Sequence, residues 1–249
     1  MPKSEIQKPS EELWNCLTQL QNSADQKAVQ LYTDWLNTAR PKQLGPSKYF
    51  PIWLILAGRG WGKTRTGAQD IALFALRNPN SICAVVAPTH GDLRRVCFNG
   101  PSGLMSIIPE ECFAKDVSGY SSYRGEEITL SNGSKIIGYA AINPDRLRGP
   151  QFHRAWCDEL AAWRYPEAFD QLMFGLRLGD NPQCLITTTP KPQKLIKDLV
   201  ERGAKLGVDS DVPNYYAKTL KGFFGKYAGG GWRTYKQLVQ ATEYATRMG

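Results

Sequence analysis

Several features that would place this chain in a common class of protein are missing from its sequence. No apolar run is long enough to span a bilayer, and the first residues lack the apolar stretch of a signal peptide. The six cysteines include no C-x-x-C pair, and only two histidines could join them as metal ligands. We therefore expect no membrane segment and no zinc site, and we expect reduced thiols in a cytoplasm.

Charge of both signs is present, but it is unevenly distributed. Residues 1–190 contain 20 Lys and Arg against 18 Asp and Glu, whereas residues 191–249 contain 11 against 5. A basic segment favours a polyanionic partner, because the partner's counterions are released on binding. A solvated surface would have the same balance, so charge alone does not decide between the two interpretations.

Strand and helix patterns alternate along the chain. Helical spacing is found over residues 10–38, followed by a proline-rich break at 39–46. Buried strands are expected at 51–58, 81–88, 153–160 and 183–190, and helices at 63–77, 89–98, 165–177 and from 191 onward. Residues 127–140 alternate around Asn132-Gly133, which predicts a hairpin with a type I′ turn. The alternation predicts an α/β fold with a mainly parallel sheet flanked by helices on both faces.

One expected strand-to-helix turn, residues 56–69 (LAGRGWGKTRTGAQ), has the pattern of a phosphate-binding loop. Gly62, Lys63 and Thr64 match the end of G-x-x-x-x-G-K-[ST], but Ala57 occupies the place of the first glycine. Backbone N–H groups and Lys63 would bind the phosphates, and the Thr64 hydroxyl would reach Mg²⁺. Ala57 is tolerable if its φ is negative, with Gly58 beside it taking any strained torsion. The alternative is a glycine-rich turn with an unrelated lysine.

An acidic pair ends the strand expected at 153–160. Asp158 would hold the Mg²⁺, and Glu159 would orient and deprotonate the attacking water. Such a pair favours a hydrolase over a kinase, because a kinase must exclude water. The alternative, a cap on the following helix, is the better interpretation for an isolated pair but not for one paired with the upstream loop.

Three stretches, AGRGWGKTRTGA, LRGPQFHRAWCDELAAW and TTTPKP, together resemble the ATPase domain of tailed-phage terminase large subunits, from about Trp35 to Lys197. The resemblance implies a P-loop ATPase of the additional-strand, catalytic-glutamate type that hydrolyses ATP with Mg²⁺ and moves double-stranded viral DNA into a procapsid. The implied partners are double-stranded DNA, the portal protein, the small terminase subunit and further copies of the chain in a ring, without a membrane. The implied location is the host cell cytoplasm, transiently at the portal vertex.

Two other functions remain open at this point. One is a nucleic-acid ATPase of helicase type, which would need a second RecA-like domain that a chain of this length does not hold. The other is an adaptor that binds ATP only to dock a partner, against which an intact Glu159 argues.

The resemblance and the loop pattern also assign individual residues. Nucleotide binding is assigned to Gln43, Gly58, Arg59, Gly60, Gly62, Lys63, Thr64 and Arg65. Gln43 resembles the glutamine that reads the adenine edge, or else it is a solvated loop residue. Thr187, Thr188 and Thr189 resemble the coupling motif that senses the γ-phosphate, or else they are ordinary β-branched strand residues.

A guanidinium commonly stabilises the negative charge that develops on the transferred phosphoryl group. Arg59 suits action in cis or sensing of the γ-phosphate. Arg148 suits action in trans from a surface loop, with Arg146 as its main rival and Arg177 as a weaker one. The alternative for Arg148 is a loop arginine paired with a carboxylate.

We divide the chain into an N-terminal helical segment (1–38), a P-loop ATPase core (39–201) and a linker or lid subdomain (202–249), with the nuclease domain absent. Asp209 and Asp211 could face one side of a strand, but no framework around them brings a third carboxylate near. Since two-metal cleavage needs such convergence, we expect no nuclease activity from this chain.

Overall fold

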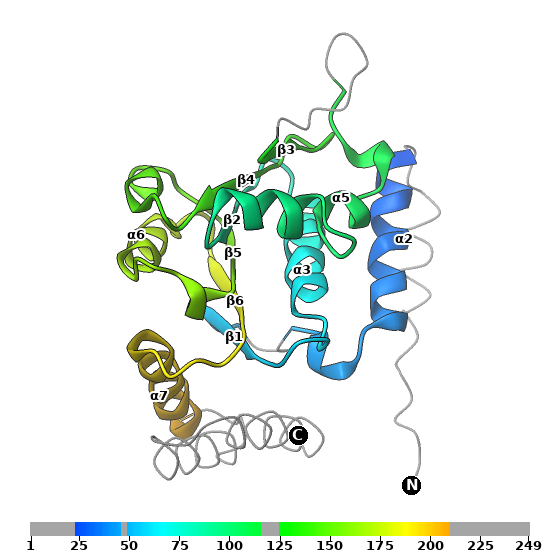
Figure 1. Ribbon diagram of the computed structural model, residues 1–249. Coiled ribbons are helices and arrows are strands. Elements are labelled where there is room, and N and C mark those ends of the chain that lie inside the picture. The colour runs from blue at the N-terminus through cyan, green and yellow to red at the C-terminus, as the bar shows by residue number, and fades with distance from the viewer. Residues whose placement is uncertain (1–22, 46–48, 116–124, 210–249) are drawn as a thin grey trace, which may run out of the picture.

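The computed structural model describes residues 23–45, 49–115 and 125–209. At its centre is a six-stranded sheet with the order β1-β6-β5-β2-β4-β3 (Figure 1). The strands are β1 (Ile52–Leu56), β2 (Ile82–Ala87), β3 (Glu127–Thr129), β4 (Lys135–Ala140), β5 (Arg154–Asp158) and β6 (Gln183–Thr188). All neighbours pair in parallel except β3, which is antiparallel to β4. The predicted α/β fold with a mainly parallel sheet is confirmed.

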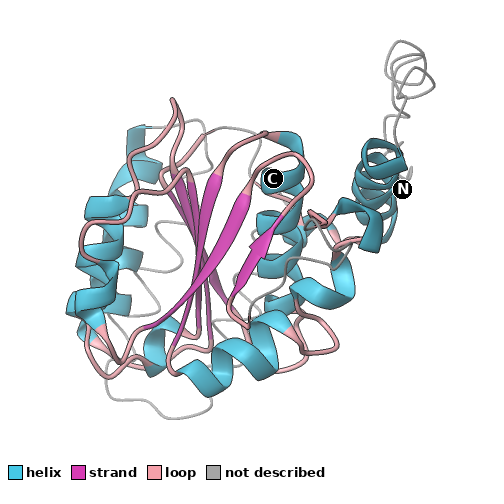
Figure 2. Ribbon diagram, turned by 90° about the horizontal axis from the view of Figure 1, so that it is seen from above, coloured by secondary structure: helices cyan, strands magenta, loops and turns pink. Residues whose placement is uncertain are grey.

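Helices cover both faces of this sheet (Figure 2). The α-helices are α2 (Ser23–Thr38), α3 (Lys63–Arg77), α4 (His90–Asp92), α5 (Leu104–Ile107), α6 (Glu167–Gly175) and α7 (Lys194–Asp209). Short 3-10 helices are η1 (Pro41–Gln43), η3 (Glu110–Cys112), η4 (Pro144–Leu147) and η5 (Leu160–Ala162), and η2 (Leu93–Phe98) is a π-helix.

Each face of the sheet has its own hydrophobic core. On one face, Ala68 and Ile71 of α3 pack with Phe98 of η2 and Leu104 of α5. On the other face, α6 and α7 pack with the opposite side chains of the same strands. All six residues of β6 are buried, as expected for a parallel strand that is covered on both faces.

Two local predictions need correction. The hairpin between β3 and β4 is present, but its turn is not type I′, because that type needs positive φ at Asn132 as well as at Gly133 and only Gly133 has it. The helix expected from Thr89 to Phe98 is a short α-helix, capped by the Thr89 side chain, that continues as the π-helix η2.

The C-terminal helix continues past the boundary proposed at 201/202, because α7 ends at Asp209. Asp209 is therefore helical, so the possibility that it faces one side of a strand is excluded. Asp211 and residues 210–249 lie outside the described residues, as does the part of the first expected helix before Ser23. Within the described ranges, no helix combines the length and the apolar character that a bilayer crossing requires.

Candidate active site

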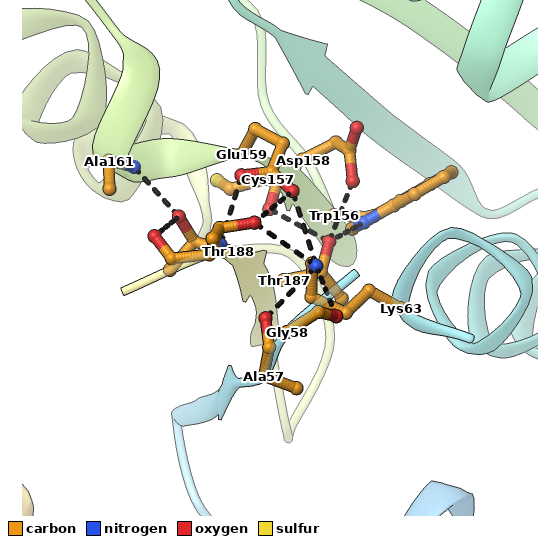
Figure 3. A network of polar contacts seen from close by, with 11 residues as sticks. Ala57, Gly58, Lys63, Trp156, Cys157, Asp158, Glu159, Ala161, Thr187 and Thr188 are labelled. Carbon is orange, nitrogen blue, oxygen red and sulfur yellow. Dashed lines mark hydrogen bonds and ion pairs between the residues drawn. The ribbon is translucent and has the colours of Figure 1, made fainter. Parts of the chain in front are cut away.

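The predicted loop, acidic pair and threonines converge at one edge of the sheet. The loop after β1, the carboxyl end of β5 and the carboxyl end of β6 are adjacent because β6 lies between β1 and β5. Ligands bind at this edge in open α/β sheets. Figure 3 shows Lys63, Asp158, Glu159 and Thr187 joined there in one polar network.

The left-handed backbone conformations of the phosphate-binding loop are found at glycines. Gly60 has φ 78° and Gly62 has φ 90°, which are left-handed values that favour glycine. Ala57 has no positive φ, as predicted, and its N–H bonds to Thr188 O at 3.2 Å. Gly58 has no positive φ either, so the conformational freedom of glycine is not needed there. Replacing the first glycine by alanine is thus compatible with the loop.

Lys63, the first residue of α3, is buried with its ammonium held by the loop. Nζ donates to the carbonyls of Ala57 at 3.0 Å and Gly58 at 3.1 Å, and to Thr189 Oγ1 at 3.2 Å. It also lies 3.4 Å from Glu159 Oε1. Phosphate oxygens would replace these neutral acceptors, since an ammonium binds anions more strongly.

Asp158, the last residue of β5, is buried, and burial disfavours the ionised form of its carboxyl. Burial raises the pKa of this carboxyl to about 7, against the opposing effects of a hydrogen bond from Thr187 and of the nearby Lys63. The neighbouring Glu159 raises the same pKa further. A cation at this position would stabilise the ionised carboxylate.

Glu159 follows the strand in a conformation that non-glycine residues seldom adopt. Its φ of 46° and ψ of 47° lie in the left-handed region, and its N–H bonds to Thr187 O at 2.6 Å. The carboxylate accepts from the Thr189 N–H at 2.9 Å and from the Thr189 hydroxyl at 3.0 Å. Backbone strain of this kind is found at functional sites when the surrounding contacts hold it.

The three threonines have different partners. Thr187 faces Asp158, with Oγ1 2.9 Å from Oδ1, whereas the Thr188 hydroxyl accepts from the Ala161 N–H at 3.0 Å. Thr189 contacts both Lys63 and Glu159. These threonines therefore join the phosphate-binding loop to the acidic pair and to the segment after it.

Gln43 lies beside the loop and not on a solvated surface. It is buried, and its Nε2 donates to Thr66 Oγ1 at 3.1 Å. Its Oε1 accepts from the N–H and the Nε of Arg40, whose guanidinium stacks on Trp61 and donates to the Trp61 carbonyl. The amide of Gln43 thus ties the segment before β1 to the first turn of α3. The solvated-loop alternative for Gln43 is wrong.

The remaining predicted residues differ in exposure. Arg59 is exposed, Thr64 is partly buried, and burial lowers the pKa of Arg65. Arg146 and Arg148 are exposed at η4, where Arg148 pairs with Asp145 at 3.3 Å. Arg148 and the exposed Arg177 also line a pocket of about 160 Å³ beside α6.

The donors at this edge suit Mg²⁺. This ion is bound through one or two carboxylates together with substrate phosphates, and Asp158 and the Thr64 hydroxyl offer hard oxygen donors of that kind. The raised pKa of Asp158 marks a buried carboxylate that a cation would stabilise. Within the described part of the chain, no three His, Cys, Asp or Glu side chains gather as a site for a protein-only metal.

Three residues with contacts at the site were not singled out from the sequence: Arg40, Trp61 and Trp156, whose Nε1 donates to Thr187 Oγ1 at 2.7 Å. Trp156 has a signal that could have been used, because it precedes Asp158 by two residues on a strand and so shares its face. Arg40 and Trp61 have none, since their contact joins positions on either side of β1.

Comparison with solved structures supports the fold. The ATPase domain of the Thermus phage P74-26 large terminase has a TM-score of 0.50 at 14% identity, over 94% of this chain and 98% of that one. The large terminase of another thermophilic bacteriophage has a TM-score of 0.45 at 13% identity, and its complex with ADP has a TM-score of 0.43 at 14% identity. This chain is matched over 66% of its length to both of these structures and spans 38% of the length of that terminase.

The sequence comparisons give one assignment. No curated protein matches the chain. The family described as "Terminase large subunit, T4likevirus-type, N-terminal" matches residues 54–218, which include the phosphate-binding loop, the acidic pair and the threonines. The chain therefore belongs to the family of T4-like terminase large subunits, and it matches the N-terminal, ATPase part of that family.

Proposed function

We propose that this chain hydrolyses ATP and uses the reaction to move double-stranded viral DNA into a procapsid. The observation that carries the proposal is the contact of Glu159 with Thr189 and Lys63 at the edge where Asp158 ends β5. In our proposal, Glu159 is the base, Lys63 the phosphate-binding cation and Thr189 the coupling hydroxyl of this one network. Family membership supports an ATPase, and the coupling to DNA is our inference.

In this proposal, each residue has one role. Lys63 leaves the loop carbonyls and binds the β- and γ-phosphates, and the positive end of α3 adds to the attraction. Glu159 is freed from Lys63, orients a water and takes its proton. Asp158 and the Thr64 hydroxyl would hold Mg²⁺, whose charge would offset that of the phosphates. Gln43 keeps its adenine-reading role as a hypothesis, although its amide already bonds within the chain.

In the proposal, Thr189 couples ATP hydrolysis to a change in the rest of the domain. Its hydroxyl and N–H bond to the carboxylate of Glu159, so loss of the γ-phosphate changes the partners of Lys63, Glu159 and Thr189 together. That change would pass along β6 to α7, which follows it in the chain.

The partners and location remain as expected from the sequence: the portal protein, the small terminase subunit and a ring of copies in the host cytoplasm. Free thiols at the five described cysteines suit a reducing compartment. DNA cleavage is not part of the proposal, because two-metal cleavage needs several converging acids and Asp209 lies on α7.

The deciding experiment measures Mg²⁺-dependent ATP turnover with and without double-stranded DNA. A motor is expected to hydrolyse ATP faster with double-stranded DNA than with single-stranded DNA. Preference for single strands would favour the helicase-type alternative. Nucleotide binding without any turnover, even when the ring partners are supplied, would favour the adaptor.

A further inference from the structure

A buried tryptophan lies next to the proposed metal ligand and has no role in the mechanism above. Trp156 precedes Asp158 by two residues on β5, so both side chains lie on the face covered by α3. Its Nε1 donates to Thr187 Oγ1 at 2.7 Å, and that oxygen lies 2.9 Å from Asp158 Oδ1. Figure 3 shows the three side chains joined in this order. Trp156 and Thr187 are fully buried, and Asp158 is nearly so.

When Asp158 is ionised, as a metal ligand must be, the hydrogen bonds among these three side chains can run in only one direction. An indole N–H donates and never accepts, so Thr187 Oγ1 must be the acceptor of the first bond. The single hydroxyl hydrogen of Thr187 is then left for the carboxylate at 2.9 Å or for the Cys157 carbonyl at 3.4 Å. The shorter, charge-assisted bond to Asp158 is the stronger one. Trp156 therefore directs the Thr187 hydroxyl at the carboxylate.

The tryptophan is in turn placed by the phosphate-binding helix. Gly67 lies one turn after Lys63 on α3, and a Cβ added there would come within 2.1 Å of Trp156 Cε2. A glycine within a helix is disfavoured relative to alanine, so this position has a glycine where the helix backbone meets the indole. The helix that carries Lys63 and the strand that carries Asp158 are thus in contact through Trp156.

We propose that Trp156 is a positioning residue for the metal site, which through Thr187 fixes the Asp158 carboxylate in the orientation that binds Mg²⁺ beside the nucleotide. The inference rests on the proposed function, because it takes Asp158 as the metal ligand. It also separates the roles of the threonines: Thr187 orients the metal ligand Asp158, and Thr189 holds the base Glu159.

The test is a titration of the full chain with Mn²⁺ in the presence of ATPγS, with free Mn²⁺ measured by electron paramagnetic resonance. Trp156→Phe is expected to weaken Mn²⁺ binding about three- to ten-fold, the range for losing one hydrogen bond. Nucleotide affinity measured without metal is expected to stay within about two-fold, since the indole is linked to Asp158 and not to the phosphates. Trp53→Phe is the matched control, because Trp53 packs against the same core from β1.

A double-mutant cycle separates positioning from packing. In a Thr187→Val chain the link to Asp158 is already cut, so adding Trp156→Phe should weaken Mn²⁺ binding no further. Thr187→Ser retains the hydroxyl and should bind Mn²⁺ as the unaltered chain does. An equal loss from Trp156→Phe in both backgrounds, or no loss in either, would overturn the proposal.

Trp156 is large and fully buried, so a shape-matched companion to Trp156→Phe controls for lost packing. Incorporating 3-benzothienylalanine at position 156 removes only the N–H, and the same loss of Mn²⁺ affinity is expected.

The Mn²⁺-binding measurement is also separate from ATP hydrolysis. A chain that binds Mn²⁺ and ATPγS but does not turn over ATP contradicts the proposed ATPase, and the comparison of variants still decides the role of Trp156. A chain that binds no Mn²⁺ with nucleotide contradicts both.

Discussion

Lys63 and Glu159 form an ion pair across the site, with Nζ 3.4 Å from Oε1, although one opens α3 and the other follows β5. Thr189 Oγ1 lies within hydrogen-bond distance of both groups. The proposed phosphate-binding cation, Lys63, and the proposed base, Glu159, are thus partners in this structure. In the proposed function, phosphate binding to Lys63 would separate the pair, so that binding of nucleotide would also release Glu159.

Lys63→Ala should weaken ATP binding about ten- to hundred-fold, the range expected for losing charge-assisted hydrogen bonds to phosphate. Equilibrium binding of a fluorescent ATP analogue would measure the loss. Lys135→Ala is the control, since Lys135 is an exposed lysine on β4. Affinity equal to that of the unaltered chain would mean that this loop does not hold phosphate.

Glu159→Gln should retain nucleotide binding and lower turnover about 10²- to 10⁴-fold, the usual contribution of a general base. The amide can still accept from the Thr189 N–H and donate to its hydroxyl, so the local structure should persist. It cannot take a proton from water. Single-turnover hydrolysis is the measurement, with Glu127→Gln as the control, and wild-type turnover would remove Glu159 as the base.

Asp158→Asn should stabilise the chain against unfolding most strongly above pH 7. Burial raises the folded pKa of Asp158 to about 7, above its ordinary value of 3.8, so the folded state binds more protons than the unfolded state between these values. The contribution of Asp158 to stability is then full below pH 3.8 and is lost as pH rises through 7.

Thermal unfolding without nucleotide or metal, at about pH 5 and about pH 8 on either side of the folded pKa, measures this difference. The gain in midpoint temperature from Asp158→Asn should be larger at the higher pH. Asp170→Asn, on the exposed face of α6, should show no such difference. An equal gain at both pH values would mean that the Asp158 carboxyl is not destabilised by burial.

Much of this fold was predictable from patterns that report on local physics. The buried runs around Val85 and Ile186 have the composition of parallel strands, and the α3 helix ends at Arg77 as its apolar spacing predicts. The turn at Asn132-Gly133 was predicted less well. Its type depends on the φ of Asn132, and the Asn132 amide also donates to the carbonyls of Ala75 and Leu76 on α3, a contact that no local pattern reveals.

Some features of the candidate site were likewise predictable from local sequence, and others were not. Lys63, Asp158 and Glu159 were predictable because each stands at a fixed place relative to a strand end. The left-handed backbone of Glu159 and the link from Trp156 to Thr187 were not, since both depend on the pairing of β5 with β6. Strand order is a tertiary property, and β6 is inserted between β1 and β5 although it comes last in sequence among the described strands.

The last prediction is that Arg148 completes the site of a neighbouring copy. Its side chain is 66% exposed, and its partner Asp145 is 84% exposed, so the pair contributes little and can be exchanged for another anion. If Arg148 acts in trans, the specific ATPase activity of the chain should rise with protein concentration. Arg148→Ala should then lower turnover by as much as about 10³-fold, the lower range for a transition-state arginine.

Mixing separates this role from action within one chain. Arg148→Ala supplies an intact Glu159, and Glu159→Gln supplies an intact Arg148, so mixed subunits should recover part of the activity that each lacks alone. Arg146→Ala mixed with Glu159→Gln tests the neighbouring arginine on η4 in the same way, and Arg59→Ala, in the loop itself, should not be rescued by any partner if Arg59 acts in cis. Full activity of Arg148→Ala in an assembled motor, with no recovery on mixing, would assign the transition-state charge to another residue.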